Sequence, residues 1–321
     1  MERAEFAIVG AGALGSILGA HLARAGHDVV MLARGERAER IERAGLQIKG
    51  LAEISQRVRV LTDPSRLHEA ECLIVATKTY ATAGALAHLR AARVGCALSI
   101  QNGLMKNEQL AESWGRQCVL GAVADTSGEL LPGGEVLFTR NEQLAIGEPS
   151  GERSVRAQKV AQSIDASGVR ASAVEDIQTL EWSKFAAWTG LMVLSITTRT
   201  PTWQYLTDAD SARVLARVVR EIGALAAAHG IALSDRAPLP VAQIVGGSED
   251  AAVAAVRRVG ERFRALAPTH RMSSLQDLEA GRPIELEETL GYAVRLAQQA
   301  TLSLPLLASF YRDFRQTLRR P

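Results

Sequence analysis

A glycine-rich turn near the N-terminus constrains the fold more than any other feature of this sequence. The apolar run 6–9 is typical of a buried strand, residues 14–25 show helical periodicity up to Gly26, and Gly10-Ala11-Gly12-Ala13-Leu14-Gly15 joins the two. In such a unit the glycines allow a tight turn, close approach of a ligand, and close packing of helix on strand. The helix N-terminus adds partial positive charge, so the segment predicts a pyrophosphate site.

The remaining pattern predicts two domains. The first half alternates short apolar runs with amphipathic segments, as in a parallel sheet with helices on both faces. Its further strands are expected at residues 28–32, 58–61, 72–76 and 96–100 and from Val119, followed by a hairpin turn at Gly133-Gly134. Main helices of the second half are expected at 176–198, 208–230, 249–266 and 284–301. We therefore predict an α/β fold with a doubly wound Rossmann-type domain (1–175) and an all-helical domain (176–321).

Composition narrows the class of protein further. The chain has 321 residues, of which 47% are hydrophobic and 22% charged, as is typical of a globular protein. Its formal net charge is only +2, so we do not expect it to bind nucleic acid. Cys72, Cys96 and Cys118 have no paired spacing and the histidines form no ligand pair, so we expect no disulfide and no metal. Apolar runs are too short to span a bilayer, and we expect a cytoplasmic protein without a membrane partner.

The residues after the second predicted strand distinguish the two nicotinamide dinucleotides. A site for NAD usually offers an acidic residue there, which accepts a hydrogen bond from the ribose 2′-hydroxyl. This chain instead has Arg34, whose guanidinium can form paired hydrogen bonds with a 2′-phosphate. The pattern favours NADPH. Glu36, two residues further on, is the argument for NAD, and a solvated surface arginine is the structural alternative for Arg34.

Two further strand ends carry polar residues. Ala76-Thr77-Lys78 and Gln101-Asn102-Gly103 each follow a predicted strand. Because ligands of doubly wound sheets bind outside the carboxyl ends of the strands, Lys78 and Asn102 are predicted to contact the cofactor. The alternative is a loop cation and an ordinary Asn-Gly turn.

At these residues the chain resembles the ketopantoate reductase (2-dehydropantoate 2-reductase) family. The shared segments are the glycine turn, residues 25–29, the Lys78 and Asn102 segments, Pro132-Gly133, Trp182-Ser183-Lys184 and residues 273–285. The resemblance covers nearly the whole chain. It implies an oxidoreductase that reduces a small 2-oxo acid with hydride from NADPH, and a place in pantothenate biosynthesis.

The resemblance also implies roles for single residues. Lys184 matches the catalytic lysine, which hydrogen-bonds the ketone oxygen and supplies the proton, and an amine suits this role because its pKa can fall on burial. Only 5 of the 37 basic residues are lysines, which favours a role for the amine. Glu285 matches a second catalytic residue near the substrate, with an ordinary acidic helix start as the alternative. The other matched positions are Asn102 (cofactor and substrate), Ser127 (cofactor) and Ser273 (substrate carboxylate).

Three positions depart from the family pattern. Trp188, Met192 and Thr202 stand where the pantoate-forming members have asparagines, the first two being four and eight residues after Lys184 on one helix face. Replacing three amides removes hydrogen bonds to a polar substrate and predicts a more apolar or narrower pocket. We therefore expect a 2-oxo acid reductase whose best substrate is not ketopantoate. Arg199 is a candidate for binding the substrate carboxylate.

Two rival functions remain open from the sequence. A related NADP-dependent dehydrogenase that acts on another oxo acid or on an imine would use the same hydride donor. A non-catalytic NADPH-binding sensor would need the glycine turn and not Lys184. The apolar helical half also suits a homodimer.

Overall fold

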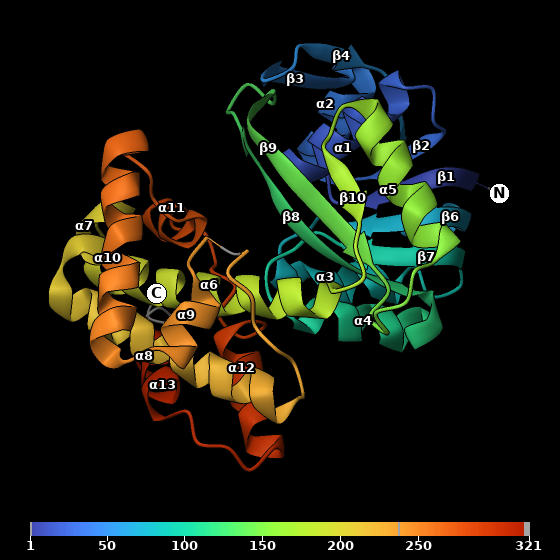
Figure 1. The fold of residues 1–321 in the computed structure, drawn as a ribbon. Coiled ribbons are helices and arrows are strands. Elements are labelled where there is room, and N and C mark those ends of the chain that lie inside the picture. The colour runs from blue at the N-terminus through green and yellow to red at the C-terminus, as the bar shows by residue number, and fades with distance from the viewer. Residues whose placement is uncertain (1, 237, 318–321) are drawn as a thin grey trace. The chain divides into compact units, whose positions relative to one another are not determined.

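The computed structural model describes residues 2–236 and 238–317 (Figure 1). The chain forms two compact units, residues 1–178 and 179–321. The division falls three residues after the boundary predicted at 175/176.

The first unit contains a mixed sheet with helices on both faces. Its strands are β1 (Glu2–Val9), β2 (Val29–Leu32), β3 (Leu46–Gly50), β4 (Ile54–Gln56), β5 (Arg59–Leu61), β6 (Leu67–Val75), β7 (Arg93–Ser99), β8 (Val119–Leu130), β9 (Val136–Gly147) and β10 (Ala171–Ala173). Its helices are α1 (Ala13–Arg24), α2 (Gly35–Ala44), α3 (Thr79–Ala87), α4 (Met105–Trp114) and α5 (Val155–Ser167), with 3₁₀ turns at Pro64–Arg66 and Arg116–Cys118.

The strand order is β4-β3-β9-β8-β7-β6-β1-β2-β5, with β10 beside β9. From β5 to β8 every neighbouring pair is parallel, as predicted for a doubly wound domain. The long β8–β9 hairpin then reverses the direction, and β3 and β4 extend the sheet beyond it (Figure 1). The sheet is therefore mixed. The hairpin lies at the predicted turn Gly133-Gly134, whereas the extension of the sheet by β3 and β4 was not predicted.

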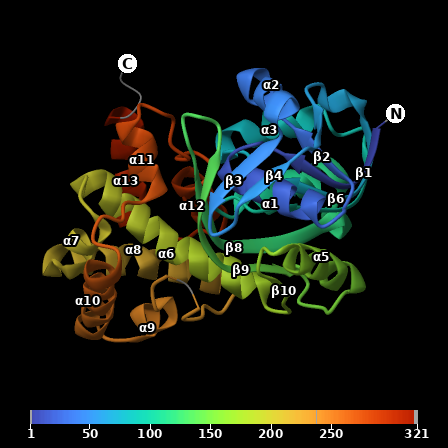
Figure 2. The same cartoon turned by 90° about the horizontal axis from the view of Figure 1, so that it is seen from above.

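Strand β1 shows how the two faces are covered. Phe6 and Ile8 belong to a core cluster that includes residues of α1, α2 and α5. Ala7 and Val9 belong to the opposite cluster, which includes residues of α3 and α4. Successive side chains of a strand point to opposite faces, so β1 is buried on both (Figures 1 and 2).

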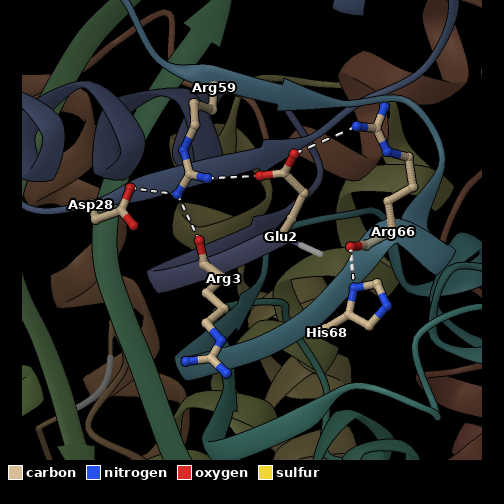
Figure 3. Close-up of polar contacts among 6 residues, drawn as sticks. All are labelled: Glu2, Arg3, Asp28, Arg59, Arg66 and His68. Atoms are coloured by element: carbon tan, nitrogen blue, oxygen red, sulfur yellow. Dashed lines mark hydrogen bonds and ion pairs between the residues drawn. The ribbon is translucent and has the colours of Figure 1, made fainter.

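The amino-terminal edge of the sheet is held by charged side chains (Figure 3). The Arg59 guanidinium on β5 donates to the carboxylates of Glu2 and Asp28 and to the Arg3 carbonyl. Glu2 also pairs with Arg66 at 3.5 Å. These contacts tie β5 to β1 and β2 at the edge opposite the glycine turn.

A histidine is buried between α1 and the β9 side of the core. His21 is 2% exposed, its ring stacks edge-on to Phe138, and Nδ1 donates to the Ser167 carbonyl at 2.9 Å. Within the described residues Nε2 is buried without a hydrogen-bond partner. Burial lowers the pKa of His21 and the Arg24 charge adds to this, while the hydrogen bond to the Ser167 carbonyl opposes it, so the net shift favours the neutral ring.

This burial predicts a pH-dependent stability. As the pH falls below the ordinary histidine pKa of about 6.5, the unfolded chain takes up a proton that the folded chain does not, so stability is lost from about pH 6.5 downward. We expect His21→Gln to remove up to about 1.4 kcal/mol per pH unit of this slope. Chemical denaturation at a series of pH values measures it, and His68→Gln, an exposed histidine, is the control. An identical slope in His21→Gln and the parent chain would contradict the assignment.

The second unit is helical. Its helices are α6 (Ile177–Thr198), which begins two residues before the division, α7 (Thr202–Thr207), α8 (Ala209–Ala228), α9 (Val241–Gly246), α10 (Glu249–Leu266), α11 (Ser273–Glu279), α12 (Leu290–Gln299) and α13 (Pro305–Thr317). The four main helices expected from periodicity correspond to α6, α8, α10 and α12; the predicted start of the last, at residue 284, lies six residues early. Helices α7, α9, α11 and α13 were not predicted. No helix in the described ranges combines the length and apolarity needed to cross a membrane.

Helix α6 is buried along most of its length, and small residues let other helices approach closely. A Cβ on Gly190 of α6 would lie 3.0 Å from Leu215 of α8. A Cβ on Gly260 of α10 would lie 2.8 Å from Leu206 of α7. Asp208 and Ser248 cap α8 and α10 through their side-chain oxygens.

Candidate active site

The carboxyl ends of four parallel strands lie side by side in the first unit. In the register of the sheet, Val9 of β1 pairs with Leu32 of β2 on one side and with Val75 of β6 on the other. Val75 in turn pairs with Ser99 of β7. The predicted cofactor segments leave from this common edge: the glycine turn after β1, Arg34 after β2, Lys78 after β6 and Asn102 after β7.

The three glycines of the turn differ in why a larger residue would or would not fit at their positions. Gly10 has φ +105°, and a Cβ there would lie 2.8 Å from the Thr77 nitrogen. A Cβ on Gly15 would lie 2.0 Å from the Gly10 carbonyl oxygen. At Gly12 the nearest atom, the Ala76 oxygen, is 3.9 Å away. The protein's own packing therefore requires glycine at 10 and 15 and leaves space at 12.

Helix α1 starts beside that open position. Gly12 is its N-cap and provides no side-chain cap, and the first turn carries no acidic residue. The first intrahelical hydrogen bond runs from the Ser16 amide to the Gly12 carbonyl at 3.0 Å. The amides of Ala13, Leu14 and Gly15 precede it and have no acceptor within the helix, so they can donate to an anion. Uncapped amides beside an open Cβ position fit a pyrophosphate group.

Arg37, which was not predicted as a site residue, holds the glycine turn through hydrogen bonds. Its Nε donates to the carbonyl of Ala11 at 2.9 Å, Nη2 to Ser16 Oγ at 2.9 Å and Nη1 to the Gly134 carbonyl at 2.6 Å. Burial, with help from the Arg40 charge, lowers the pKa of Arg37, but a guanidinium remains charged at neutral pH. Arg37 thus fixes the turn and places a positive charge against it. Its position three residues after Arg34, in the first turn of α2, was the available signal.

Arg34 is exposed at the N-cap of α2, directly after β2 and Ala33. Glu36, the residue that argued for NAD, forms an ion pair with Arg40 at 2.6 Å. The Glu36 carboxylate thus forms an exposed ion pair along α2, and Arg34 is the first charged residue after β2.

Gln101 joins the two other strand ends and was not predicted as a site residue. It is 8% exposed, and its Nε2 donates to the Thr77 carbonyl at 2.7 Å and to Thr82 Oγ1 at 2.6 Å. Ser99 Oγ donates to its Oε1 at 2.8 Å. The buried amide therefore fixes the segment before Lys78 against the segment that carries Asn102. Both of these site candidates are partly exposed.

A buried lysine reinforces the same edge. Lys106 is 4% exposed, and its Nζ donates to the Ser99 carbonyl at 3.0 Å and to the Ala122 carbonyl on β8. One of the five lysines thus has a structural role in the sheet. Rarity alone did not distinguish it from Lys78 and Lys184.

Ser127 lies elsewhere, on the β8–β9 hairpin. It is exposed and its Oγ is 3.1 Å from Thr139 Oγ1 on β9. The hairpin crosses α1 at the next residue, Gly128, where a Cβ would lie 2.8 Å from Ile17. Ser127 therefore lies on the hairpin, next to a residue that packs on α1, the helix that begins at the glycine turn.

In the second unit the candidate residues follow one face of α6. Lys184, Trp188 and Met192 are spaced four residues apart, and Ser195 continues the face. Lys184 is partly exposed, whereas Trp188 and Met192 are 7% and 0% exposed. The indole and the thioether are therefore buried on the helix face that carries the lysine.

Helix α11 packs at the end of this face. Ser195 Oγ is 3.5 Å from Ser274 Oγ, and the neighbouring Ser273 is the first residue of α11 and is exposed. The second unit thus places Ser273 near the α6 face. Arg199 is exposed just after α6 and has φ +53°, an uncommon conformation for a residue other than glycine.

Thr202 is fully buried, and its hydroxyl is already engaged. Its Oγ1 is 2.9 Å from His270 Nδ1 and accepts from the Tyr205 hydroxyl at 3.3 Å. Its amide donates to the His270 carbonyl at 2.9 Å. Burial raises the pKa of Tyr205. These contacts fasten α7 to the loop before Ser273, which suits a positioning role for Thr202.

Glu285 lies in the segment between α11 and α12 and is 8% exposed. Because α12 begins at Leu290, Glu285 is not part of an acidic first turn, and that alternative is wrong. Glu287 has a separate role, since it accepts from the Tyr311 hydroxyl at 2.5 Å. Burial, together with the charges of Glu285 and Glu287, raises the pKa of Glu288. In the described residues no cluster of three or more metal-ligating side chains was found.

The parallel strands and the glycine turn define a dinucleotide-binding α/β domain, joined in the chain to a helical unit. Comparison with known proteins gives the family. Residues 6–151 match the ketopantoate reductase PanE/ApbA domain, and residues 176–317 match the C-terminal domain of the same family. The chain therefore belongs to the ketopantoate reductase PanE/ApbA family of oxidoreductases.

Individual relatives span the whole chain. A 2-dehydropantoate 2-reductase of Archaeoglobus fulgidus is 30% identical over 292 residues, which cover 91% of this chain and 90% of that protein. A PanE/ApbA family ketopantoate reductase from Ralstonia eutropha JMP134 is 25% identical with a TM-score of 0.81, covering 99% and 98% of the two chains. D-mandelate dehydrogenase with NADH and anilino(oxo)acetate has the same fold (TM-score 0.80, 17% identity, 99% and 100% covered).

Proposed function

We propose that this protein reduces a 2-oxo acid to the 2-hydroxy acid with NADPH. The observation that carries the proposal is the open position at Gly12 beside the uncapped N-terminus of α1, with Arg34 at the neighbouring strand end. Backbone amides there can bind the pyrophosphate, and the Arg34 guanidinium can bind a 2′-phosphate. Lys78, Asn102 and Ser127 are proposed as further cofactor contacts.

The proposed chemistry divides between the coenzyme and side chains of the helical unit. A bound nicotinamide coenzyme supplies hydride for the ketone carbon. Lys184 donates a hydrogen bond to the ketone oxygen and gives up a proton from Nζ as that oxygen becomes a hydroxyl. Glu285 binds a polar group of the substrate, and Ser273 binds its carboxylate.

The substrate is proposed to carry an apolar side chain. Trp188 and Met192 are buried on the helix face that bears Lys184 and provide no amide to a polar substrate. A relative of the same fold is a D-mandelate dehydrogenase. We therefore favour 2-oxo acids with a wholly apolar alkyl or aryl side chain over ketopantoate.

A panel of 2-oxo acids with NADPH tests the substrate. We expect kcat/KM for a 2-oxo acid with a wholly apolar alkyl or aryl side chain to exceed that for ketopantoate by about tenfold or more, since lost hydrogen bonds discriminate strongly. Trp188→Asn with Met192→Asn should shift the ratio toward ketopantoate. A wide preference of the parent chain for ketopantoate would contradict the interpretation of both residues.

Arg34 predicts the coenzyme preference. Arg34→Ala should raise the Kd of NADPH about 10- to 100-fold, because charge-assisted hydrogen bonds contribute about 1.5–3 kcal/mol, and should leave the Kd of NADH unchanged. Fluorescence titration measures both constants. Arg43→Ala, an exposed arginine at the other end of α2, is the matched control. An equal rise in the Kd of NADPH and of NADH would contradict the proposed contact between Arg34 and the 2′-phosphate.

The same substrate panel also tests two alternative functions, a dehydrogenase that acts on an imine and a non-catalytic sensor. An amine in the substrate panel distinguishes an imine-forming dehydrogenase from a 2-oxo acid reductase. A sensor would bind NADPH and oxidise it with none of the panel. A homodimer and a cytoplasmic location stay predictions of the sequence.

A further inference from the structure

Two of the three cysteines, which are 24 residues apart in sequence, are direct neighbours in the sheet. Cys72 of β6 and Cys96 of β7 are partners in the parallel register. Both belong to the core cluster on the α1 and α5 side of the sheet, so their side chains share one face. Neighbouring strands lie about 4.8 Å apart. This separation falls within the Cα–Cα range of about 4.4–6.8 Å that a disulfide requires.

The pair lies at a cavity that is separate from the proposed coenzyme edge. The cavity has a volume of about 480 Å³ and is lined by the amino-terminal halves of β6 and β7 and by α5. Cys72 and Cys96 both line it and are 2% and 4% exposed. The side chains of Arg93 and Lys159 at the same cavity are 75% and 66% exposed. A small molecule can thus enter between exposed charged side chains and reach two buried thiols.

The two thiols differ chemically. Cys96 Sγ donates to the Glu71 carbonyl at 3.5 Å. The neighbouring Cys72 thiol lowers the pKa of Cys96 and the Arg156 charge adds to this, whereas burial and the charges of Glu148 and Glu71 oppose it. The Cys96 thiol, followed by burial, raises the pKa of Cys72 well above its usual range. Arg156 lines the same cavity as Cys96, and a positive charge beside this thiol favours it as the attacking nucleophile.

We propose that Cys72 and Cys96 are a redox-sensitive dithiol that a small hydroperoxide, entering through this cavity, converts to a disulfide. The Cys96 thiolate attacks the peroxide and breaks the O–O bond, forming a sulfenic acid and, with one proton, releasing water or an alcohol. The Cys72 sulfur then attacks the sulfenic sulfur; its proton and the sulfenic hydroxyl leave as a second water. The two thiols lose two electrons and the peroxide gains them.

The cross-link would join the strands whose carboxyl ends lead to Lys78 and Asn102. Its formation does not depend on the proposed reductase function, because no coenzyme or substrate residue takes part. Cys118 provides the internal control. It is buried nearby, and its thiol donates to the Val94 carbonyl at 3.3 Å, but it does not line the cavity.

Hydrogen peroxide on the reduced, folded full chain tests the proposal. After removal of the peroxide, denaturation and alkylation, we expect the free thiols to fall from three to one, with a reducible cross-link between the peptides of Cys72 and Cys96 by mass spectrometry. Three alkylated cysteines, or a cross-link that includes Cys118, would overturn it.

Two variants identify the order of attack. In Cys72→Ala, dimedone should trap a sulfenic acid on Cys96, whereas Cys96→Ala should give little labelling of Cys72. Cys118→Ser should form the cross-link like the parent chain. Equal labelling of Cys72 and Cys96 would contradict the assigned nucleophile, and the parent-chain experiment decides the cross-link even where a variant does not fold.

Discussion

Lys184→Met is expected to lower kcat for 2-oxo acid reduction about 10²–10⁴-fold while the Kd of NADPH stays nearly unchanged. The loss corresponds to removal of a positioned proton donor, which typically contributes that factor. Methionine keeps the length of the side chain and its packing on α6, so the fold should remain intact. Steady-state kinetics and coenzyme titration of the same preparation measure the two effects.

Two further lysine variants sharpen this result. Lys184→Arg keeps the positive charge but cannot give up a proton near neutral pH, so its kcat should remain low. Lys159→Met removes an exposed lysine that pairs with Glu71 on the sheet and should have full activity. Turnover of Lys184→Met at the parent rate would remove the lysine from its proposed role.

Gly12→Ala is expected to lose coenzyme affinity and keep its stability, whereas Gly15→Ala is expected to lose stability. At Gly12 the backbone has φ −70° and the added Cβ meets nothing closer than 3.9 Å, so the fold should be as stable as the parent or more so. The methyl group occupies the space proposed for the pyrophosphate, and the Kd of NADPH should rise about 100-fold or more, a loss of about 3 kcal/mol in binding.

At Gly15 the effect falls on stability. The Cβ would lie 2.0 Å from the Gly10 carbonyl oxygen, and backbone must move to admit it. We expect a loss of about 3 kcal/mol in the free energy of unfolding, the upper end for overpacking. Gly84→Ala on α3, where nothing lies within 4 Å, is the matched control and should be neutral or stabilising. Normal coenzyme affinity in a well-folded Gly12→Ala would contradict the proposed site.

Much of the first unit could be predicted because its signals are local. The apolar run of β1, the glycines and the helical stretch before Gly26 are contiguous, and each reports its own conformation. The placement of Lys78 and Asn102 at one edge followed from a general property of parallel sheets. The hairpin at Gly133-Gly134 was predicted, but the extension of the sheet by β3 and β4 was not, because the pairing of β3 with β9 joins residues far apart in sequence.

In the second unit the short helices and the segment around Glu285 could not be predicted from local patterns. The long amphipathic or apolar stretches gave α6, α8 and α10 within a few residues, but six- and seven-residue helices such as α7 and α11 are too short to show a period. The acidic run at Glu285 suggested a helix start. In the structure Glu285 is buried five residues before α12, because tertiary packing and not local propensity places that segment.

By itself the sequence determined the glycine turn, the residues at the strand ends and the spacing of Lys184, Trp188 and Met192 along one helix face. These depend on local periodicity and on covalent spacing. Only the tertiary structure decided that Arg37 and Gln101 brace the turn and the strand ends, that Gly12 is open while Gly15 is not, and that Cys72 lies beside Cys96. These are contacts between distant parts of the chain, and their distances exist only once the sheet and its helices have packed.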